Sequence, residues 1–582
     1  MDLGDALLDL DGVPWGTLAF RAPRELHQAA RVEEVLPAVR AAERAAAAGL
    51  WVVGFLAYEA APAFDAALRV RPQGAGPLAV FLVYDAPVAR EALEAAGEAR
   101  LGPLAPDVTP DVYAASIARL REEIAAGTAY QVNHTFRLRG PFAGDPRALY
   151  ERLRRAQGGG LGACLHLGER AIVSASPELF LAVNGRTVTA RPMKGTARRG
   201  RWLEEDLAAS AALAASEKDR AENVMIVDLV RNDLGRVATT GSVRVASLFD
   251  VERYRTVLQL TSTVEAQLAP GRGLAELLAA AFPCGSVTGA PKASAMGLIA
   301  REEGAPRGVY CGAIGAIAPG GDAAFNVAIR TVELDLVKGE ATAGVGGGIT
   351  WGSTAEGEWQ EALAKGAFLE AAAAAEEGPP ALVETLRLEG GRFPLLELHL
   401  ARLEASARHL GLAVDVAAAR AALEAAAAAG GDARIRLVAP ERAAPRLERA
   451  PLPPPAAAPL PVALAAAPVS RRDLRLFHKT TARAPYDEAR RARPEAFDVL
   501  LWNEEGELTE FTIGNLVAEL AGGERVTPPR DAGLLAGVFR AKLLAEGAVR
   551  EQTLRVADLP SARRLWLVNA VRGFVPVRLV GP

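Results

Sequence analysis

Lysine is scarce in this chain, and this scarcity makes the remaining lysines candidates for chemistry. Of the 66 basic residues among 582, seven are lysine. Arginine supplies surface charge but stays protonated, so it cannot replace an amine that acts as a nucleophile. Lys338 and Lys542 lie in charged, surface-like sequence, and we interpret them as ordinary surface residues. The other five are Lys194, Lys218, Lys292, Lys365 and Lys479.

Lys194 follows a predicted strand, 187–191, that Pro192 stops. Neighbouring positive charge and burial both favour the neutral, nucleophilic form of an amine. A basic loop that binds anions is the alternative, and these residues alone do not separate the two. The arginines expected to crowd Lys194 are Arg191, Arg198, Arg199 and Arg201.

Two predicted helices each carry a pair of carboxylates on one face. The sequence S-E-K-D at 216–219 resembles a capping box, which marks the start of one helix. Mg²⁺ typically binds one or two protein carboxylates and takes its other ligands from water and substrate. Solvated helix faces are the alternative interpretation. The four residues are Asp219 and Glu222 on the first helix and Glu358 and Glu361 on the second, where Lys365 shares the same arc.

Two glycine-rich segments, 285–292 and 344–348, are predicted to be loops whose backbone N–H groups face an anion. Neither has the spacing of a Walker A or dinucleotide-binding motif, so nucleotide binding is not supported. Arg330 is a single charge in an apolar strand pattern, 326–331, and we expect it to face a carboxylate of the substrate or of the protein.

A different set of polar residues occupies the last 200 positions. Pyridoxal phosphate requires a lysine, an acid for its ring nitrogen and donors for its phosphate. Taken singly, Glu510 is typical of a surface turn and His399 of a helix surface. The set comprises His399 and Arg402 on one predicted helix, Lys479, Glu510, and a loop at 533–540 that runs into a helix.

Composition limits the kind of protein. Half the residues are apolar, 23% are charged, and the net charge is −4, which is typical of a soluble globular chain and argues against a basic nucleic-acid-binding face. Three cysteines are too few for a disulfide framework. The apolar run 452–469 contains six prolines and is predicted to be a linker plus a short strand rather than a membrane helix. With an acidic start and no signal peptide, we expect a cytoplasmic protein.

The chain is predicted to hold two domains, 1–375 and 381–582, joined by a linker at 376–380 where a helical pattern meets E-E-G-P-P. The second domain divides into lobes at about 381–468 and 469–582. Adjacent strand patterns without intervening helices favour antiparallel sheets in the first domain.

Several motifs of the first domain occur in the order seen in chorismate-utilising enzymes. They are S-P-E-L-F, R-P-M-K-G-T, K-D-R-A-E-N, G-S-V-T-G-A-P-K, A-I-R-T and E-W-Q-E-A-L-A-K. Residues 10–375 thus resemble component I of aminodeoxychorismate synthase. The resemblance implies an α+β multidomain fold that begins with a large sandwich of antiparallel sheets flanked by helices.

The same resemblance implies roles for individual residues. Glu222 and Glu361 hold Mg²⁺ with support from Asp219 and Glu358, and Glu178 assists departure of the C4 hydroxyl. Lys194 is the nucleophile, where anthranilate synthases have a small residue. Gln131 stands where isochorismate synthases have a lysine base, and Gln259 where anthranilate synthases have a histidine. The implied substrate-binding residues are Gln131, Thr288, Tyr310, Arg330, Gly346, Gly348 and Lys365.

Residues 381–582 resemble the fold-type IV pyridoxal phosphate enzymes, with spacing similar to 4-amino-4-deoxychorismate lyase. The resemblance implies a two-lobed domain with Lys479 as the Schiff-base lysine and Glu510 at the pyridine nitrogen. Arg402, Gly537 and Val538 hold the phosphate, and residues 569–572 line the substrate side. Aminotransferases share these cofactor motifs, so this half alone does not separate lyase from transaminase.

The two halves together predict a fused enzyme that makes 4-aminobenzoate from chorismate. Ammonia is expected from a separate glutamine amidotransferase subunit or from free ammonium, and the resemblance allows a homodimer through the C-terminal domain. An anthranilate synthase-like domain fused to an amino-acid aminotransferase is the alternative enzyme. A chorismate-binding regulator is the non-enzymatic alternative, against which both retained lysines argue.

Overall fold

A computed structural model describes residues 4–13, 15–72, 74, 76–95, 97–374, 380–456 and 458–580. It divides the chain into two compact units, each made of two stretches of sequence. The first is Met1–Arg198 with Ser210–Glu376, and the second is Arg199–Ala209 with Glu377–Pro582. All but the last residue of the predicted linker 376–380 lies outside the described residues. The placement of Arg199–Ala209 in the second unit was not predicted.

Within its described residues, the first unit contains two ten-stranded sheets in which every strand pair is antiparallel. The first sheet contains β1 (Ala6–Leu10), β2 (Gly16–Phe20), β6 (Ala99–Leu101), β7 (Ala105–Pro106), β8 (Gln131–Gly144), β9 (Leu161–His166), β10 (Arg170–Ser176), β16 (Gly289–Ala290), β19 (Thr331–Asp335) and β20 (Glu340–Ile349). The second contains β3 (Glu25–Ala29), β4 (Trp51–Leu56), β5 (Ala79–Tyr84), β11 (Leu179–Asn184), β12 (Thr187–Arg191), β13 (Met193–Arg198), β14 (Arg244–Arg253), β15 (Val257–Gln267), β17 (Ala313–Ile317) and β18 (Ala323–Val327).

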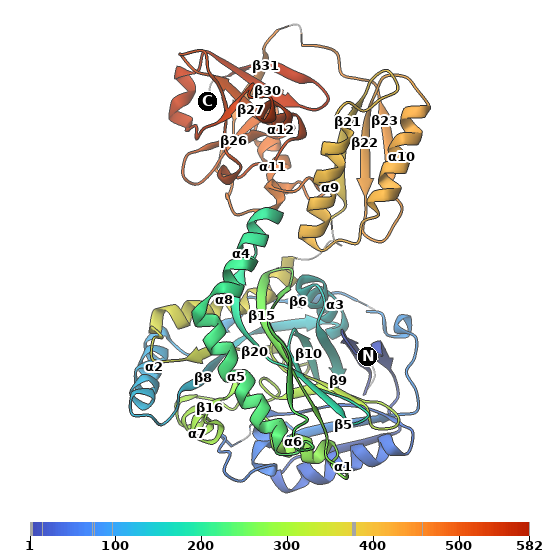
Figure 1. Ribbon diagram of the computed structural model, residues 1–582, viewed down its shortest axis with the longest axis vertical. Coiled ribbons are helices and arrows are strands. Elements are labelled where there is room, and N and C mark those ends of the chain that lie inside the picture. Colours follow the sequence, from blue (N-terminus) through green and yellow to red (C-terminus); the bar gives the residue numbers. More distant parts are fainter. Residues whose placement is uncertain are drawn as a thin grey trace. The chain divides into compact units, whose positions relative to one another are not determined.

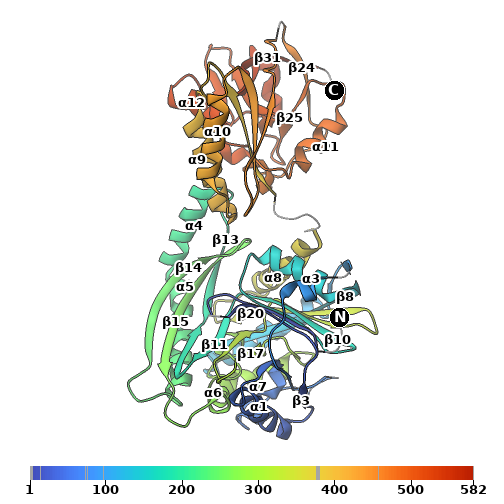
Figure 2. The same ribbon diagram turned by 90° about the vertical axis from the view of Figure 1, so that its right-hand side faces the viewer.

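The two sheets face each other across an apolar core and carry helices on their outer faces. Leu8, Phe55 and Ile314, from β1, β4 and β17, belong to the cluster between the sheets. The second sheet is covered by α1 (Val32–Ala47), α5 (Glu217–Gly235) and α6 (Leu274–Ala281). The first is covered by α2 (Pro110–Ala125), α3 (Pro146–Gln157), α7 (Lys292–Glu302) and α8 (Ala355–Ala374). This is the predicted antiparallel sandwich, and Figure 2 shows α5 beside the long strands β14 and β15.

The second unit has two lobes, each built on its own sheet (Figure 1). The sheet of the first lobe packs against α9 (Leu396–Leu410) and α10 (Val416–Ala428). Its strands are β21 (Leu382–Leu388), β22 (Ala433–Ala439) and β23 (Arg446–Ala450). The sheet of the second lobe contains β24 (Leu460–Leu464), β25 (Asp498–Trp502), β26 (Leu508–Phe511), β27 (Gly514–Glu519), β28 (Arg525–Thr527), β29 (Arg550–Glu551), β30 (Arg564–Asn569) and β31 (Gly573–Leu579). The helices of this lobe are α11 (Ala484–Ala492) and α12 (Val538–Ala545).

The two lobes are confirmed, but the boundary predicted at residue 468 is too late. The strand β24 pairs in parallel with β25 and β31, so it belongs to the second lobe's sheet. The connection between the sheets therefore runs from Ala450 to Leu460, through the proline-rich stretch. Among the described residues, no helix combines the length and apolar character needed to cross a membrane.

Candidate active sites

The glycine-rich segment 344–348 is part of strand β20 and not the predicted loop. A side chain there would collide with its neighbours. A Cβ on Gly344 would lie 2.1 Å from the ring of Tyr310, and one on Gly348 would lie 1.9 Å from Nε2 of Gln131 and 2.5 Å from Nζ of Lys194. Glycine in a strand interior commonly marks such a close approach. The bare surface of β20 is therefore where Gln131 and Lys194 meet.

Lys194 is the second residue of β13, with a side chain that is 17% exposed. Its Nζ lies 3.8 Å from a carboxylate oxygen of Glu222. Burial lowers the pKa of Lys194, and the positive charge of Lys365 lowers it further. The amine is therefore biased toward its neutral, nucleophilic form.

Arginines do not produce this effect, so the predicted crowding of Lys194 by basic neighbours is wrong. Arg191 pairs with Glu252 at 3.4 Å, Arg199 with Asp206 at 2.7 Å, and Arg201 with Glu205 at 2.8 Å. Two of these three arginines belong to the second unit. Desolvation, and not the basic stretch of sequence, is the main cause of the lowered pKa of Lys194.

Glu178 is a buried carboxyl between β10 and β11. The hydroxyl of Ser286 donates to its Oε1 at 2.6 Å. Burial raises the pKa of Glu178 to about 7, although Ser286 and the charge of Lys194 act in the opposite direction. A carboxyl with that pKa is partly protonated at neutral pH, which is what a general acid requires.

The four carboxylates predicted to hold a metal lie on α5 and α8, as expected. Ser216 caps α5 by accepting a hydrogen bond from the backbone N–H of Asp219, which confirms the predicted helix start. On α8, the hydroxyl of Ser353 donates to Glu358 at 2.6 Å. Both helices direct charge at Lys194, because Glu222, Glu361 and Glu358 all influence the pKa of that lysine.

The donor chemistry fits a hard cation such as Mg²⁺. Burial raises the pKa of Glu358, and the nearby charge of Glu361 raises it further, so a bound cation would offset both effects. Within the described part of the chain, no three His, Cys, Asp or Glu side chains form a ready-made metal cluster. A site here would therefore combine few protein carboxylates with water and substrate oxygens.

The residues predicted to bind substrate are only partly brought together. Lys365 donates to the carbonyl of Gly346 at 3.0 Å, and Gln131 is buried with its Oε1 unpaired. The buried ring of Tyr310 packs against β20 at Gly344. Gln131, Lys194 and Lys365 thus lie against β20 at Gly346 and Gly348.

Arg330 and Thr288 are positioned by other contacts. Arg330 lies between β18 and β19 with a φ of 50°, so the predicted continuous strand over 326–331 is wrong. Its guanidinium donates to the amide oxygen of Gln157, and burial lowers its pKa to about 10. The buried hydroxyl of Thr288 donates to the carbonyls of Cys284 and Gly285. Arg330 thus remains a candidate partner for a substrate carboxylate.

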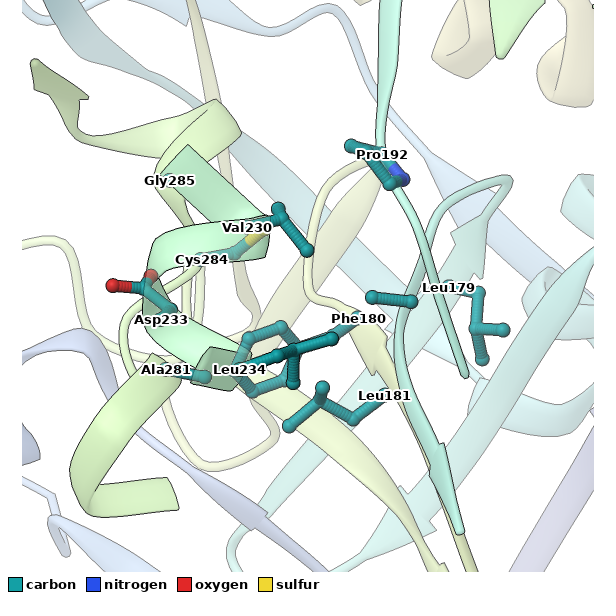
Figure 3. Close-up of a pocket in the computed structure, with 11 residues that line it drawn as sticks. Leu179, Phe180, Leu181, Pro192, Val230, Asp233, Leu234, Ala281, Cys284 and Gly285 are labelled. Atoms are coloured by element: carbon teal, nitrogen blue, oxygen red, sulfur yellow. The ribbon is translucent and has the colours of Figure 1, made fainter. Parts of the chain in front are cut away.

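An apolar pocket in the first unit borders these groups, since Cys284 and Gly285, which accept from Thr288, line it. It is lined by none of the predicted site residues (Figure 3). The carboxylate of Asp233 at its edge accepts from Lys292 at 2.8 Å, which explains the retention of that lysine as a buried ion pair. Its other lining residues are Leu179, Phe180, Leu181, Ala190, Pro192, Val230, Leu234, Ala281, Cys284 and Gly285.

In the second unit, Lys479 and Glu510 both have strongly shifted pKa values. Burial lowers the pKa of Lys479 to about 8, with help from the charge of Arg402. Glu510 is buried in β26, not exposed in a turn, and burial raises its pKa to about 7. It accepts hydrogen bonds from the hydroxyl of Tyr486 at 2.8 Å, the N–H of Leu535 at 2.9 Å and the amide of Asn515 at 3.1 Å.

Glu384, on β21, organises the remaining predicted cofactor residues. It accepts two hydrogen bonds from Arg402, at 2.9 and 2.6 Å, and contacts Nδ1 of His399 at 2.6 Å. Burial opposes its ionisation, but Arg402 and His399 outweigh burial and lower the pKa of Glu384 to about 2. His399 is therefore buried, contrary to its interpretation as a helix-surface residue.

Arg402 also reaches the predicted phosphate-binding loop. Its third nitrogen donates to the carbonyl of Ala536 at 3.1 Å, immediately before Gly537, which caps α12. A Cβ on Gly537 would lie 1.9 Å from Oδ1 of Asn515, so only glycine fits there. A buried amine, a buried acid and an arginine beside a helix N-terminus together suit pyridoxal phosphate.

Sequence reasoning missed three residues of this arrangement. Glu384 could have been noticed as the one carboxylate in the apolar strand pattern L-V-E-T-L, whereas Tyr486 and Asn515 have no comparable signal.

Comparison with known proteins matches each region to a different family. Residues 89–371 match the chorismate binding enzyme model, and residues 381–580 match the amino-transferase class IV model. The chain is 43% identical over 260 residues to anthranilate synthase component 1 of Streptomyces coelicolor, covering 44% of this chain and 50% of that protein. It is 40% identical over 259 residues to aminodeoxychorismate synthase component 1 of Escherichia coli K12, covering 44% of this chain and 57% of that protein.

A solved structure supports the fold of the first unit. Anthranilate synthase component I from Streptococcus pneumoniae aligns with a TM-score of 0.52 and 26% identity, over 63% of this chain and 90% of that one. The chain spans about half the length of the curated relatives it matches. Residues 89–371 are a chorismate binding enzyme region and residues 381–580 are a class IV amino-transferase region, and this pairing confirms the predicted fusion.

Proposed function

We propose that this chain converts chorismate into 4-aminobenzoate in two steps, amination at C4 and then elimination of pyruvate. The observation that carries the proposal is the pairing of a half-buried amine, Lys194, with a buried acid, Glu178, beside the bare glycine strand β20. The fusion of this region to a class IV aminotransferase region supports the second step.

In the first step, the neutral amine of Lys194 attacks ring C2 while the C4–O bond breaks. Glu178 gives its proton to the departing hydroxyl, which leaves as water. Ammonia then attacks C4 and Lys194 leaves from C2, so that the amine ends at C4 and the lysine is regenerated. The lowered pKa of Lys194 and the raised pKa of Glu178 suit these opposite roles.

Two glutamines direct the outcome. Gln131 cannot deprotonate water as a lysine base could, so addition of water is disfavoured. Gln259 accepts from the hydroxyl of Thr196 at 3.0 Å and has no titratable proton to promote loss of pyruvate. The product of this site is therefore 4-amino-4-deoxychorismate, with its pyruvyl group retained.

Glu222 and Glu361 are the proposed ligands of Mg²⁺, supported by Asp219 and Glu358. When bound, the ion supplies positive charge for the substrate carboxylate. Lys365, Arg330, Tyr310, Thr288 and the backbone of Gly346 and Gly348 complete the proposed substrate site.

In the second step, Lys479 is the covalent attachment point of pyridoxal phosphate and the group that moves the proton. Glu510 holds the ring nitrogen, and Arg402 with the N–H groups of Gly537 and Val538 holds the phosphate. When bound, the cofactor supplies the electron sink for elimination of pyruvate. We further propose that ammonia comes from a separate glutamine amidotransferase subunit. A homodimer through the C-terminal domain and a cytoplasmic location stay predictions.

The relatives include an anthranilate synthase, so anthranilate is the alternative product to be tested. Product analysis separates the two. With chorismate, ammonium, Mg²⁺ and pyridoxal phosphate, the full chain is expected to form 4-aminobenzoate and pyruvate in equal amounts. Anthranilate formed without any need for pyridoxal phosphate would support the alternative and refute the proposal.

A further inference from the structure

Residues 199–209 lie inside the region that matches the chorismate-binding enzymes, yet they belong to the second unit. The segment comprises a short turn and the start of α4 (Leu203–Ala215). It follows directly after β13, the strand that carries Lys194. Its contacts within the second unit are extensive enough to suggest a function there.

Trp202 is the apolar anchor of this segment. Its ring lies 5.4 Å from that of Phe477, and it packs against a buried cluster that includes Leu476 and Tyr486. The guanidinium of Arg201 lies 4.7 Å from the ring of Trp202, and that of Arg530 lies 4.5 Å from it. Stacking and cation–π contacts of this kind hold an aromatic side chain in a single position.

Polar contacts fix the backbone beside Trp202. The carbonyl of Arg201 accepts from Nε2 of His478 at 3.0 Å, while Nδ1 of His478 meets the hydroxyl of Ser406 at 3.1 Å. His478 also stacks on His409, with 4.6 Å between ring centres. Burial lowers the pKa of His478 to about 3, so the ring stays neutral and keeps this hydrogen-bond arrangement.

Ion pairs also join residues 199–209 to the rest of the second unit. Arg201 pairs with Asp531 at 3.1 Å, and Arg530 pairs with Glu204 at 3.4 Å. Arg199 donates to the carbonyl of His409 at 2.6 Å. The segment is thus held at its start, at its centre and on the first turn of α4.

The contacts of Arg201 and Trp202 involve residues next to two groups of the proposed cofactor site, Lys479 and Glu510. His478 immediately precedes Lys479, and Tyr486, which packs in the same cluster as Trp202, donates to Glu510. We propose that Arg201 and Trp202 are positioning residues of the pyridoxal phosphate site, acting through His478 and Tyr486. The inference rests on the proposed function of the second unit. It means that the C-terminal region is an incomplete module without residues 199–209.

The test uses the full chain and measures pyridoxal phosphate binding as well as activity. Trp202→Ala is expected to weaken cofactor affinity on the order of tenfold and to shift the pH midpoint of the bound cofactor's absorbance. Trp202→Phe should recover most of both. Leu207→Ala, at an exposed position of α4, should match the wild type.

A second control separates positioning from general stability. Leu423→Ala removes a buried side chain of α10 in the first lobe and should lower the unfolding temperature without moving the pH midpoint. The inference is overturned if Trp202→Ala binds cofactor like the wild type, or if Leu423→Ala shifts the midpoint equally. A wild type that binds no pyridoxal phosphate, or binds it as Lys479→Ala does, would overturn the proposed function as well.

Discussion

At the scale of single residues, burial sets the protonation of the groups that do the proposed chemistry. Glu178 and Glu510 are buried carboxyls whose pKa values rise to about 7, and burial lowers the pKa of Lys194. A carboxyl with a raised pKa can donate a proton near neutral pH, and an amine with a lowered pKa can attack. Each site thus holds a carboxyl and an amine whose pKa values are both shifted by burial.

Glu178 should set the alkaline limb of the pH profile for chorismate consumption. Because it acts in its protonated form and its pKa is about 7, the rate should fall as the pH rises above about 7. Lys194 acts in its neutral form and should set the opposite, acid limb. Glu178→Gln should reduce kcat about 10²- to 10⁴-fold and remove the alkaline limb. A steady-state pH profile measures both, and an unchanged alkaline limb in the variant would contradict the role of Glu178.

Residue types and spacing identify some of these groups and miss others. Lys194 and Lys479 stand out because so few lysines are present, and Glu178 lies in a recognisable motif. Glu384 shows only as a single carboxylate in an apolar strand pattern, and its role depends on contacts between β21 and α9 that residue spacing does not encode. The predicted crowding of Lys194 by arginines fails for the same reason, because Arg199 pairs with Asp206 and Arg201 pairs with Glu205.

At the scale of elements, strand β20 provides three glycine positions, Gly344, Gly346 and Gly348, that tolerate no side chain. Gly348→Ala would place a Cβ 1.9 Å from Gln131 and 2.5 Å from Lys194. We expect kcat/KM for chorismate to fall by roughly tenfold or more, since small misplacements of reacting groups are costly. Gly352→Ala is the matched control, because nothing lies within 4 Å of its Cβ position. Equal kinetics for the two variants would refute the proposed place of β20 in the site.

The contact between β21 and α9 depends on the buried charge of Glu384. Glu384→Gln leaves Arg402 without its ionic partner, and breaking a buried pair typically costs about 3–5 kcal/mol. Because the folded-state pKa of Glu384 is lowered to about 2, its stabilising effect is present above its ordinary pKa and is lost as the pH falls toward 2. Urea unfolding at pH 7 should show a lower midpoint, while chorismate consumption is retained. Unchanged stability would contradict this role.

An element boundary can be predicted from the sequence where its signal is local, but not where it depends on neighbouring elements. The S-E-K-D motif correctly marks the start of α5, because a serine N-cap acts within its own helix turn. The run Gly344–Gly348 suggests a loop, yet its neighbours require a bare strand. The predicted strand over 326–331 is interrupted, because β18 ends at Val327 and Arg330 has a left-handed backbone before β19 begins.

At the scale of the whole molecule, the sequence predicts two domains and an antiparallel sandwich because strand patterns follow one another without helices. The assignment of Arg199–Ala209 to the second unit could not be predicted. It depends on partners such as Phe477 and Asp531, which lie hundreds of residues away in sequence. Local patterns do not specify contacts of that kind.

The most direct test of two reactions in series is the product formed by Lys479→Ala with chorismate, ammonium, Mg²⁺ and pyridoxal phosphate. Its first site is intact, so it should consume chorismate and accumulate 4-amino-4-deoxychorismate with little pyruvate. Lys194→Ala should leave chorismate largely unreacted but convert supplied 4-amino-4-deoxychorismate normally. Mass spectrometry of the Lys479→Ala reaction decides the matter. Accumulated intermediate is the predicted result, and 4-aminobenzoate formed at the wild-type rate would contradict the account.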